Sequence, residues 1–345
     1  MGVLHSILRV SILSLFASSA LAADDGGRFV SEPAEFVRVC DAYGAGFYYI
    51  PGSEVCLQID GYVRQDIKFG LFGADLDGDF IGDAYSSVTR AAVRLDARSE
   101  TEMGTLRSYI QINFDVDGAL ADVDQDAQIE NAYIEIGGLR VGFTDSLFTT
   151  LTYYAGGVLR DDIVGYGPFG TNQIAYTFSS TNGFAASVAL EQGYGAQLAD
   201  GDVPHIVAGT SYTKEWGSVA AVAAYDSVSE EWAAKARLDV TLSPVYSVFL
   251  MAGLKSDDSP PYSQFYGVWG GEWAAWAGGT AKVSETTALN AQLSLDGEEN
   301  FAAVANVVYE MVPGFSVTPE VGYYENFDIA DSGVFGGMIR FRRLF

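Results

Sequence analysis

The sequence has few histidines, cysteines and basic residues, and each shortage argues against a class of protein. Only His5 and His205 are present among 345 residues, so we expect no multi-histidine metal site and no histidine-based catalytic set. Two cysteines are too few for a disulfide-dense scaffold. With 19 basic and 45 acidic residues the formal net charge is −26, which argues against nucleic-acid binding because phosphate contacts need a basic face. We therefore predict no metal, no cofactor and no nucleic-acid partner.

The first 22 residues have the pattern of an export signal. They combine a weakly basic start, a short apolar run and the small-x-small sequence Ala20-Leu21-Ala22. The apolar run is shorter than the roughly 18 residues that a membrane-spanning helix needs. We predict a signal peptide over residues 1–22, with cleavage after Ala22 or else after Ala23, and one domain over residues 23–345. A buried first helix is the alternative. Loss of Arg9 makes the mature formal charge −27.

The rest of the chain alternates apolar and polar residues in pieces of about ten residues, which is the period of a β-strand. The first piece places Leu57, Ile59 and Val63 on one face and Asp60 and Arg64 on the other. Further pieces cover residues 90–98, 106–116, 139–144, 174–178, 184–190, 232–240, 289–295 and 335–345. A soluble sandwich would turn the apolar face inward, whereas an outer-membrane barrel would turn it towards lipid.

Three features favour the barrel: the strands are long and numerous, their polar faces carry many charges that suit a wet lumen, and aromatic residues lie near their ends. The aromatic residues that fit interfacial girdles are Tyr48, Tyr49, Tyr153, Tyr154, Trp273, Trp276, Tyr323 and Tyr324. At about 20 residues per strand and connection, the fifteen or sixteen pieces predict an all-β, 16-stranded antiparallel transmembrane β-barrel around water.

Residues 31–64 carry an ordered set of short motifs. They are Pro33, Val37-Arg38-Val39-Cys40, Asp41-Ala42-Tyr43-Gly44, Gly46-Phe47, Ile50-Pro51-Gly52, Cys56-Leu57 and Gly61-Tyr62-Val63-Arg64. This stretch resembles the N-terminal signature of the alphaproteobacterial general porin family. A terminal aromatic residue, here Phe345, is shared by many outer-membrane barrels. The resemblance implies a homotrimer of 16-stranded channels in the bacterial outer membrane that pass small hydrophilic solutes, with a long third loop folded into the lumen.

A counterpart of that loop lies at residues 145–172, between strands that end near Thr144 and begin near Gln173. It is much longer than a hairpin turn, and it follows the fifth predicted strand. Its acids Asp145, Asp161 and Asp162 are the candidates for an acidic side of the pore constriction. A solvated loop tip is the alternative for the last two.

A basic side of the constriction is predicted on the first five strands. The arginines on their polar faces are Arg64, Arg90, Arg94, Arg98, Arg107 and Arg140. A pore selects by charges fixed across a narrow water column, and crowded like charges need opposite charges or water. We expect this cluster to face the loop acids or lumen water. Alternatively, Arg64 and Arg98 pair on a wet face with Asp66 and Glu100.

Cys40 and Cys56 are the only cysteines, and in an exported protein we expect them to form one disulfide. Two reduced, buried thiols are the alternative. The acids Asp75, Asp77, Asp79 and Asp83 have the spacing of a calcium loop, but the twelfth-position Glu and the flanking helices are missing. We interpret this stretch, and the acids at 115–117 and 122–126, as outer loops that contact lipopolysaccharide through divalent ions or a neighbouring subunit.

The leading functional hypothesis is a passive, water-filled diffusion channel with a weak preference for cations. A substrate-specific channel is the closest alternative. A barrel enzyme is a further one, but His205 has only Asp202 and Ser211 near it in the sequence and no recognisable nucleophile. A structural or adhesive envelope protein would have a blocked lumen.

Overall fold

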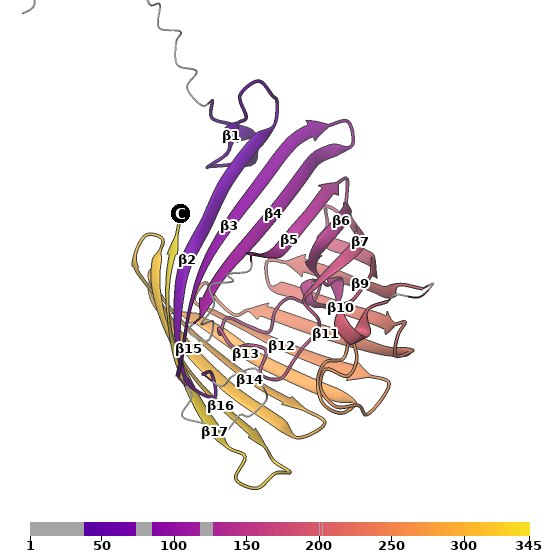
Figure 1. Ribbon diagram of the computed structural model, residues 1–345, viewed down its shortest axis with the longest axis vertical. Helices are drawn as coiled ribbons and strands as arrows, with labels where there is room; N and C mark the ends of the chain where they lie inside the picture. Colours follow the sequence, from indigo (N-terminus) through magenta and orange to yellow (C-terminus); the bar gives the residue numbers. More distant parts are fainter. Residues whose placement is uncertain (1–37, 74–84, 118–126, 200, 202) are drawn as a thin grey trace, which may run out of the picture. The chain divides into compact units, whose positions relative to one another are not determined.

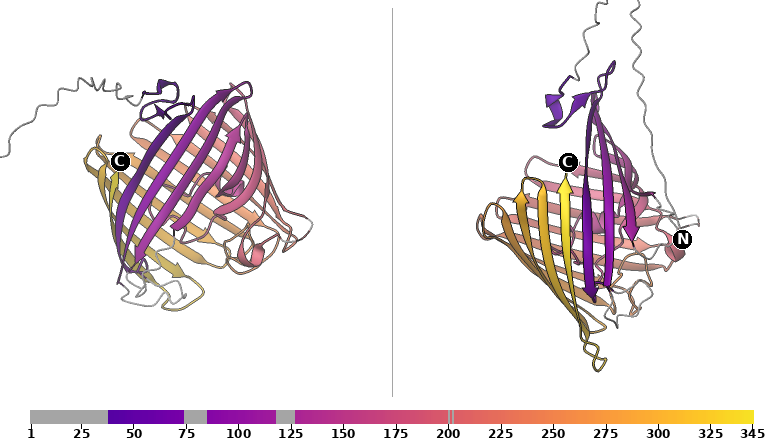
Figure 2. Two further views of the ribbon diagram at one scale, coloured as in Figure 1. Left: turned by 45° about the horizontal axis from the view of Figure 1, so that its top comes forward. Right: turned by 60° about the vertical axis from the view of Figure 1, so that its left-hand side comes forward.

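The computed structural model describes residues 38–73, 85–117, 127–199, 201 and 203–345, and these residues form one antiparallel sheet that closes on itself (Figure 1). Each strand from β2 to β17 pairs with the next, and β17 pairs with β2, which lie side by side in Figure 2. The predicted 16-stranded barrel is confirmed. The predicted signal peptide and the acidic stretches 75–83 and 122–126 lie outside the described residues.

The strands differ in length from two to seventeen residues. They are β1 Tyr48–Tyr49, β2 Cys56–Gly70, β3 Tyr85–Thr101, β4 Gly104–Asp117, β5 Ala127–Ile136, β6 Leu139–Asp145, β7 Gly170–Ser179, β8 Phe184–Glu191, β9 His205–Lys214, β10 Gly217–Asp226, β11 Glu231–Thr241, β12 Tyr246–Lys255, β13 Trp273–Lys282, β14 Thr287–Asp296, β15 Asn300–Val312, β16 Phe315–Asn326 and β17 Val334–Leu344. Three single turns of helix complete the described elements: η1 Asp41–Tyr43, α1 Leu147–Thr150 and η2 Gly195–Gln197.

The two ends of the barrel differ in their connections. At one end, here the short-turn end, successive strands are joined by two to four residues. The Asn182-Gly183 turn between β7 and β8 is typical: Gly183 has φ +90°, and a Cβ there would lie 2.2 Å from the Thr213 carbonyl oxygen. The opposite end carries the longer connections 146–169, 192–204, 256–272 and 327–333.

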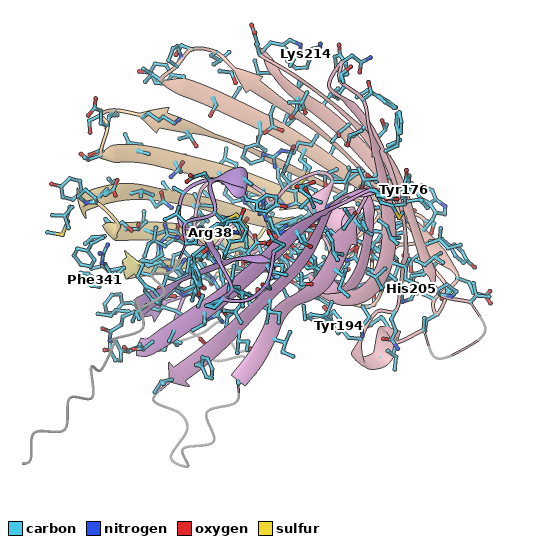
Figure 3. All side chains as sticks on the ribbon, turned by 90° about the horizontal axis from the view of Figure 1, so that it is seen from above. Arg38, Tyr176, Tyr194, His205, Lys214 and Phe341 are labelled. Carbon is cyan, nitrogen blue, oxygen red and sulfur yellow. A yellow bond between two sulfur atoms is a disulfide. The ribbon has the colours of Figure 1, made fainter. Side chains whose placement is uncertain are left out.

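Apolar side chains on the strands point away from the barrel. Ile174 on β7, Leu250 on β12 and Val321 on β16 are 54%, 56% and 64% exposed. Figure 3 shows Tyr176 and Phe341 on the outer side of the ring of strands. Polar residues of the opposite parity point inward. The predicted direction of the apolar face, outward, is therefore confirmed.

The largest buried apolar cluster joins residues of the 146–169 connection to residues of β7–β13, β15 and the 256–272 connection. Its largest members are Trp269, Trp276, Tyr166, Tyr266, Phe148 and Met251, each no more than 1% exposed. The assignment of Trp276 to an interfacial girdle is therefore wrong, because Trp276 lies on the inward face of β13 and is 0% exposed. Tyr153 and Tyr154 lie in the 146–169 connection instead of at a strand end. Among the described residues, no helix is long and apolar enough to cross a membrane.

One short strand, β1, was not predicted, because two residues carry no period. The C-terminal Phe345 exchanges backbone hydrogen bonds with Gly61 at 3.0 and 3.1 Å, so β17 stops there and leaves the first residues of β2 without that neighbour. Tyr48 and Tyr49 take the vacant place by pairing with Leu57 and Cys56. An unpaired strand edge would otherwise be exposed. The predicted disulfide between Cys40 and Cys56 is present and holds this segment at the start of β2.

Candidate functional site

The connection between β6 and β7, called loop 3 (residues 146–169), begins with a fixed helical turn. The Ser146 hydroxyl accepts the Phe148 N–H at 3.1 Å and so caps α1. The carboxylate of Glu191, at the end of β8, accepts the Ser146 hydroxyl and the Leu147 N–H, each at 2.7 Å, and the Tyr266 hydroxyl at 2.9 Å. Glu191 is 1% exposed, so these donors replace the water that a carboxylate needs. The start of loop 3 is thereby fixed.

Further along, five inward-facing side chains on the four strands β11, β13, β14 and β15 donate hydrogen bonds to backbone carbonyls of loop 3. The pairs are Lys235 to Tyr166 at 2.6 Å, Arg237 to Tyr154 at 2.7 Å, Trp276 to Val164 at 2.9 Å, Gln292 to Asp161 at 2.7 Å and Asn306 to Gly157 at 3.1 Å. Backbone groups away from water need such partners, and this is why these strands carry polar residues inward. Gly157 permits the close approach, since a Cβ there would lie 2.5 Å from Asn290 Oδ1.

Glu320 on β16 holds the next part of loop 3 through its carboxylate. It accepts the backbone N–H groups of Leu159 and Arg160, the latter at 2.9 Å, and the Asn306 side-chain amide at 2.9 Å. Glu320 is 2% exposed. Loop 3 is therefore hydrogen-bonded to Glu191 of β8 and to β11 and β13–β16, and among the described residues no hydrogen bond joins it to β2–β5.

The acids predicted for the constriction have different surroundings. Asp161 is half-buried in loop 3, and its carboxylate accepts the Tyr166 hydroxyl at 3.0 Å. Burial, with a smaller contribution from the Asp162 charge, raises the pKa of Asp161 to about 7. Asp145 ends β6 and accepts the Tyr154 hydroxyl. Asp161 is thus an acid whose charge changes near neutral pH.

The six predicted arginines lie on the inward faces of β2, β3, β4 and β6, and each is paired with a carboxylate of the same wall. The pairs are Arg64–Asp66 (3.5 Å), Arg90–Asp115 (2.5 Å), Arg94–Asp60 (3.3 Å), Arg98–Asp96 (2.7 Å), Arg107–Asp96 (2.9 Å), Arg107–Glu135 (2.9 Å) and Arg140–Glu135 (2.6 Å). We call the inward face of β2–β6 and β17 the arginine wall; its β5 contributes Glu135. The expected pairing of Arg64 with Asp66 is found, whereas Arg98 pairs with Asp96 instead of Glu100.

The arginine wall differs from the expectation in one respect. Among the described residues, no ion pair joins its arginines to Asp145, Asp161 or Asp162. The cross-strand register explains this, since it places Arg90 opposite Asp115 and Arg107 opposite Glu135. Such neighbours have Cβ atoms only about 5 Å apart. Loop 3 is held by the other strands.

Several inward-facing residues were not assigned a role from the sequence. Arg340 and Arg342 extend the arginine wall onto β17, where the register sets them opposite Asp66 and Arg64. Their polar parity is visible in the sequence, but only barrel closure makes β17 the neighbour of β2. Lys235, Arg237 and Glu320 likewise lie on the polar face of the alternating pattern, but the sequence does not indicate which residues they contact.

His205 has no triad geometry. It is 0% exposed at the start of β9, and its Nε2 lies 2.8 Å from the Gln197 carbonyl oxygen. Asp226 and the Ser227 hydroxyl both lie near the other nitrogen, Nδ1, at 3.3 and 3.4 Å. A triad needs the nucleophile and the carboxylate on opposite nitrogens. Within the described residues, no group of three or more His, Cys, Asp or Glu side chains is placed to hold a metal ion.

A closed 16-strand barrel with an apolar exterior and a charged inner wall defines an outer-membrane channel for the passive diffusion of small solutes. The chain belongs to the alphaproteobacterial general porin family, since residues 29–336 match the model of a porin subfamily. It is a multi-pass outer-membrane protein and not an enzyme.

The relatives cover the whole chain. Porin Omp2b of Brucella melitensis biotype 1 and Porin Omp2b of Brucella suis biovar 1 are each 42% identical to it over 369 aligned residues, which span 99% of this chain and 99% of each relative. Two solved structures share the fold. The outer membrane channel DcaP of Acinetobacter baumannii has a TM-score of 0.67 at 19% identity, over 86% of this chain and 99% of that one. An anion-selective porin from Comamonas acidovorans has a TM-score of 0.60 at 13% identity, over 85% and 100%.

Proposed function

We propose that loop 3 lies within the lumen and, with the arginine wall, bounds the narrowest part of a channel for small hydrophilic solutes and ions. The observation that carries this proposal is the set of hydrogen bonds from inward-facing side chains to the backbone of loop 3. Side chains that point into a barrel reach a connecting loop only if the loop enters the barrel. The ring contacts of Tyr166 with Trp276 and of Phe148 with Tyr266, within the buried apolar cluster, hold it against the strands opposite the arginine wall.

Solutes then pass between two different charged surfaces. Asp161 and Asp162 stand on the loop side, and Arg64, Arg90, Arg94, Arg98, Arg107 and Arg140 on the other. Because the arginines have wall carboxylates as partners, the wall presents alternating charges instead of one large positive field. The acidic chain as a whole draws cations to the mouths. We therefore predict a weak preference for cations.

Planar-bilayer recording of the purified full chain tests this function. We expect stepwise conductance. In a salt gradient we expect a small zero-current potential with the sign of a cation-selective channel. A protein that inserts without conductance steps would contradict the channel, and a potential of the opposite sign would contradict the cation preference. Uptake into liposomes across a size series separates the alternatives: a smooth fall with solute mass indicates general diffusion, and a saturable outlier indicates a specific channel.

We also propose a homotrimer that associates through the outer face of β2 and β3. Gln65 and Thr89 point outward from neighbouring strands, and Gln65 donates to the Ser87 hydroxyl at 3.2 Å. Polar groups on a lipid-facing surface are unfavourable without protein partners. Contact of the outer loops with lipopolysaccharide and cleavage after Ala22 are further parts of the proposal, and N-terminal sequencing of the exported protein tests the cleavage.

A further inference from the structure

Three arginines stand side by side on neighbouring strands of the arginine wall. The register places Arg342 of β17 opposite Arg64 of β2, and Arg64 opposite Arg90 of β3. All three side chains point inward. Directly opposed residues of an antiparallel sheet have Cβ atoms only about 5 Å apart, and like charges at that spacing are destabilising. Such a row therefore calls for compensating negative charge.

The carboxylates of the described residues supply only part of that charge. Arg90 takes both oxygens of Asp115, at 2.6 and 2.5 Å. Arg340 takes both oxygens of Asp66, at 2.6 and 2.8 Å, which leaves Arg64 a 3.5 Å contact to the same carboxylate. Four guanidinium groups thus share two carboxylates, and two positive charges have no counterpart.

Arg342 has no ion-pair partner among the described residues of the arginine wall. Among the described residues, no carboxylate lies within ion-pair distance of it, and its buried Nε has no hydrogen-bond acceptor. The charged side chains that act on it are Arg340 and Arg94, both positive, with the Tyr62 phenol nearby. Arg94 has its own partner in Asp60 at 3.3 Å. A guanidinium with no carboxylate beside it and one donor without an acceptor is unfavourable, so this side chain is suited to pair with an anion from outside the chain.

The row is separate from the contacts that hold loop 3. Glu320, which binds loop 3, pairs in register with Met338 of β17, and Met338 with Lys68 of β2. Arg342 and Arg64 lie four residues further along these strands towards the short-turn end, a distance of about 13 Å. By the usual orientation of such barrels, the short-turn end faces the periplasm. The row is open to solvent, since the side chains of Arg64 and Arg90 are each 21% exposed.

We propose that Arg342, Arg64 and Arg90 form a binding site for a divalent oxyanion, phosphate or a phosphomonoester, on the part of the arginine wall that lies nearer the short-turn end than Glu320. Guanidinium groups bind phosphate oxygens through paired N–H donors, and no carboxylate of the described residues neutralises the guanidinium of Arg342. Two negative charges match the two that the wall lacks. The inference rests on the proposed function, because the anion reaches the row only through a water-filled lumen.

Titration calorimetry of the detergent-solubilised full chain with sodium phosphate, at about pH 8 where phosphate is mostly divalent, tests this site. We expect saturable binding at one site per chain. Arg342→Gln removes the guanidinium that has no ion-pair partner and should weaken binding about tenfold, the usual effect of losing one hydrogen bond between charged groups. Arg342→Lys keeps the positive charge but lacks the paired donors, so its affinity for phosphate should lie between that of the unaltered chain and that of Arg342→Gln. Arg343→Gln is the matched control, because Arg343 points outward on the same strand and donates to the Pro313 carbonyl.

The outcomes separate the site from the channel itself. Absence of saturable heat with the unaltered chain, or equal weakening by Arg343→Gln and Arg342→Gln, would overturn the anion site. Conductance steps of Arg342→Gln in phosphate-free potassium chloride establish that the variant is folded. If it does not fold, Arg64→Gln replaces it, with the same weakening expected. Absence of steps in the unaltered chain would contradict the proposed function, whatever the calorimetry gives.

Discussion

At the scale of single residues, burial gives Asp161 a proton affinity that ordinary aspartates lack. Its pKa of about 7 arises mainly from loss of hydration and partly from the neighbouring charge of Asp162. The carboxyl group is therefore neutral below this pH and negative above it. In a channel where loop 3 bounds the narrow part, this single charge adds to the field that acts on passing ions.

We predict that cation preference rises as the pH increases through about 7. The zero-current potential in a potassium chloride gradient, measured between about pH 5 and 9, should follow one titration step. Asp161→Asn should abolish the step. Asp162→Asn should move it to lower pH, because the neighbouring negative charge that raises the Asp161 pKa is removed. A flat profile in the unaltered chain would contradict the assignment.

The carboxylate of Glu320 holds loop 3, and replacing it should change the conductance of the channel. In Glu320→Gln, the side chain keeps one oxygen and gains an NH₂ group, so the N–H of either Leu159 or Arg160 loses its acceptor. A lost acceptor for a buried donor costs about 1–3 kcal/mol. We expect loop 3 to loosen and single-channel conductance to become larger and noisier. Glu325→Gln, on the outward face of the same strand, is the control and should leave the conductance unchanged.

At the scale of elements, the segment from Cys40 to Cys56 is held to the barrel through a few contacts. Tyr43 donates to Glu100 at 2.8 Å, the Arg98 guanidinium lies 5.0 Å from the Phe47 ring centre, and Gln58 donates to the Ala45 carbonyl at 3.3 Å. Gln58, Arg98 and Glu100 all have inward parity. The segment therefore packs on the inner side of β2 and β3 at the short-turn end.

Replacing both cysteines by serine should release this segment and leave the barrel intact. The disulfide closes a loop over a sequence separation of 16, which corresponds to about 3 kcal/mol of chain entropy. We expect faster hydrogen exchange over residues 41–55 and unchanged exchange over β7 to β15. Reduction of the unaltered chain should have the same effect. Faster exchange throughout the barrel would show that the disulfide supports the whole fold.

At the scale of the whole molecule, the outer surface is not uniform. Most outward positions carry apolar residues, yet β2 and β3 carry Gln65, Ser87 and Thr89 there. A lipid-facing strand gains nothing from these groups, whereas a subunit contact satisfies them. This difference is the reason why we propose the trimer contact at β2 and β3.

Ser87→Trp should therefore weaken the trimer by overfilling the contact. Leu250→Trp is the control, since Leu250 is 56% exposed on β12, far round the barrel, and a larger apolar side chain there meets only lipid. We expect the trimer band on gels of unheated protein to disappear for the first variant and to persist for the second. Loss of the trimer in both variants, or in neither, would contradict this interface.

Sequence patterning was sufficient for the class of fold and the general position of loop 3, which was predicted over 145–172 and lies at 146–169. Alternation identified the inward parity of Arg64, Arg90, Arg94, Arg98, Arg107 and Arg140, because a side-chain period of two is a property of the strand alone. It failed for Trp276, since an aromatic residue near a strand end suits a girdle or an interior contact equally well. β1 was missed because its pairing exists only where β17 stops.

The sequence by itself determined a membrane barrel, since outward apolar faces and inward polar faces are local properties of each strand. The tertiary structure decided which charges meet. Register sets Arg90 opposite Asp115, and closure brings Arg342 of β17, almost the last residue of the chain, beside Arg64 of β2. Register and closure both bring together residues that are far apart in the sequence, and the order of residues alone does not give the distances between strands. The same reason hid the partners of Lys235 and Glu320, which lie in a loop more than sixty residues away.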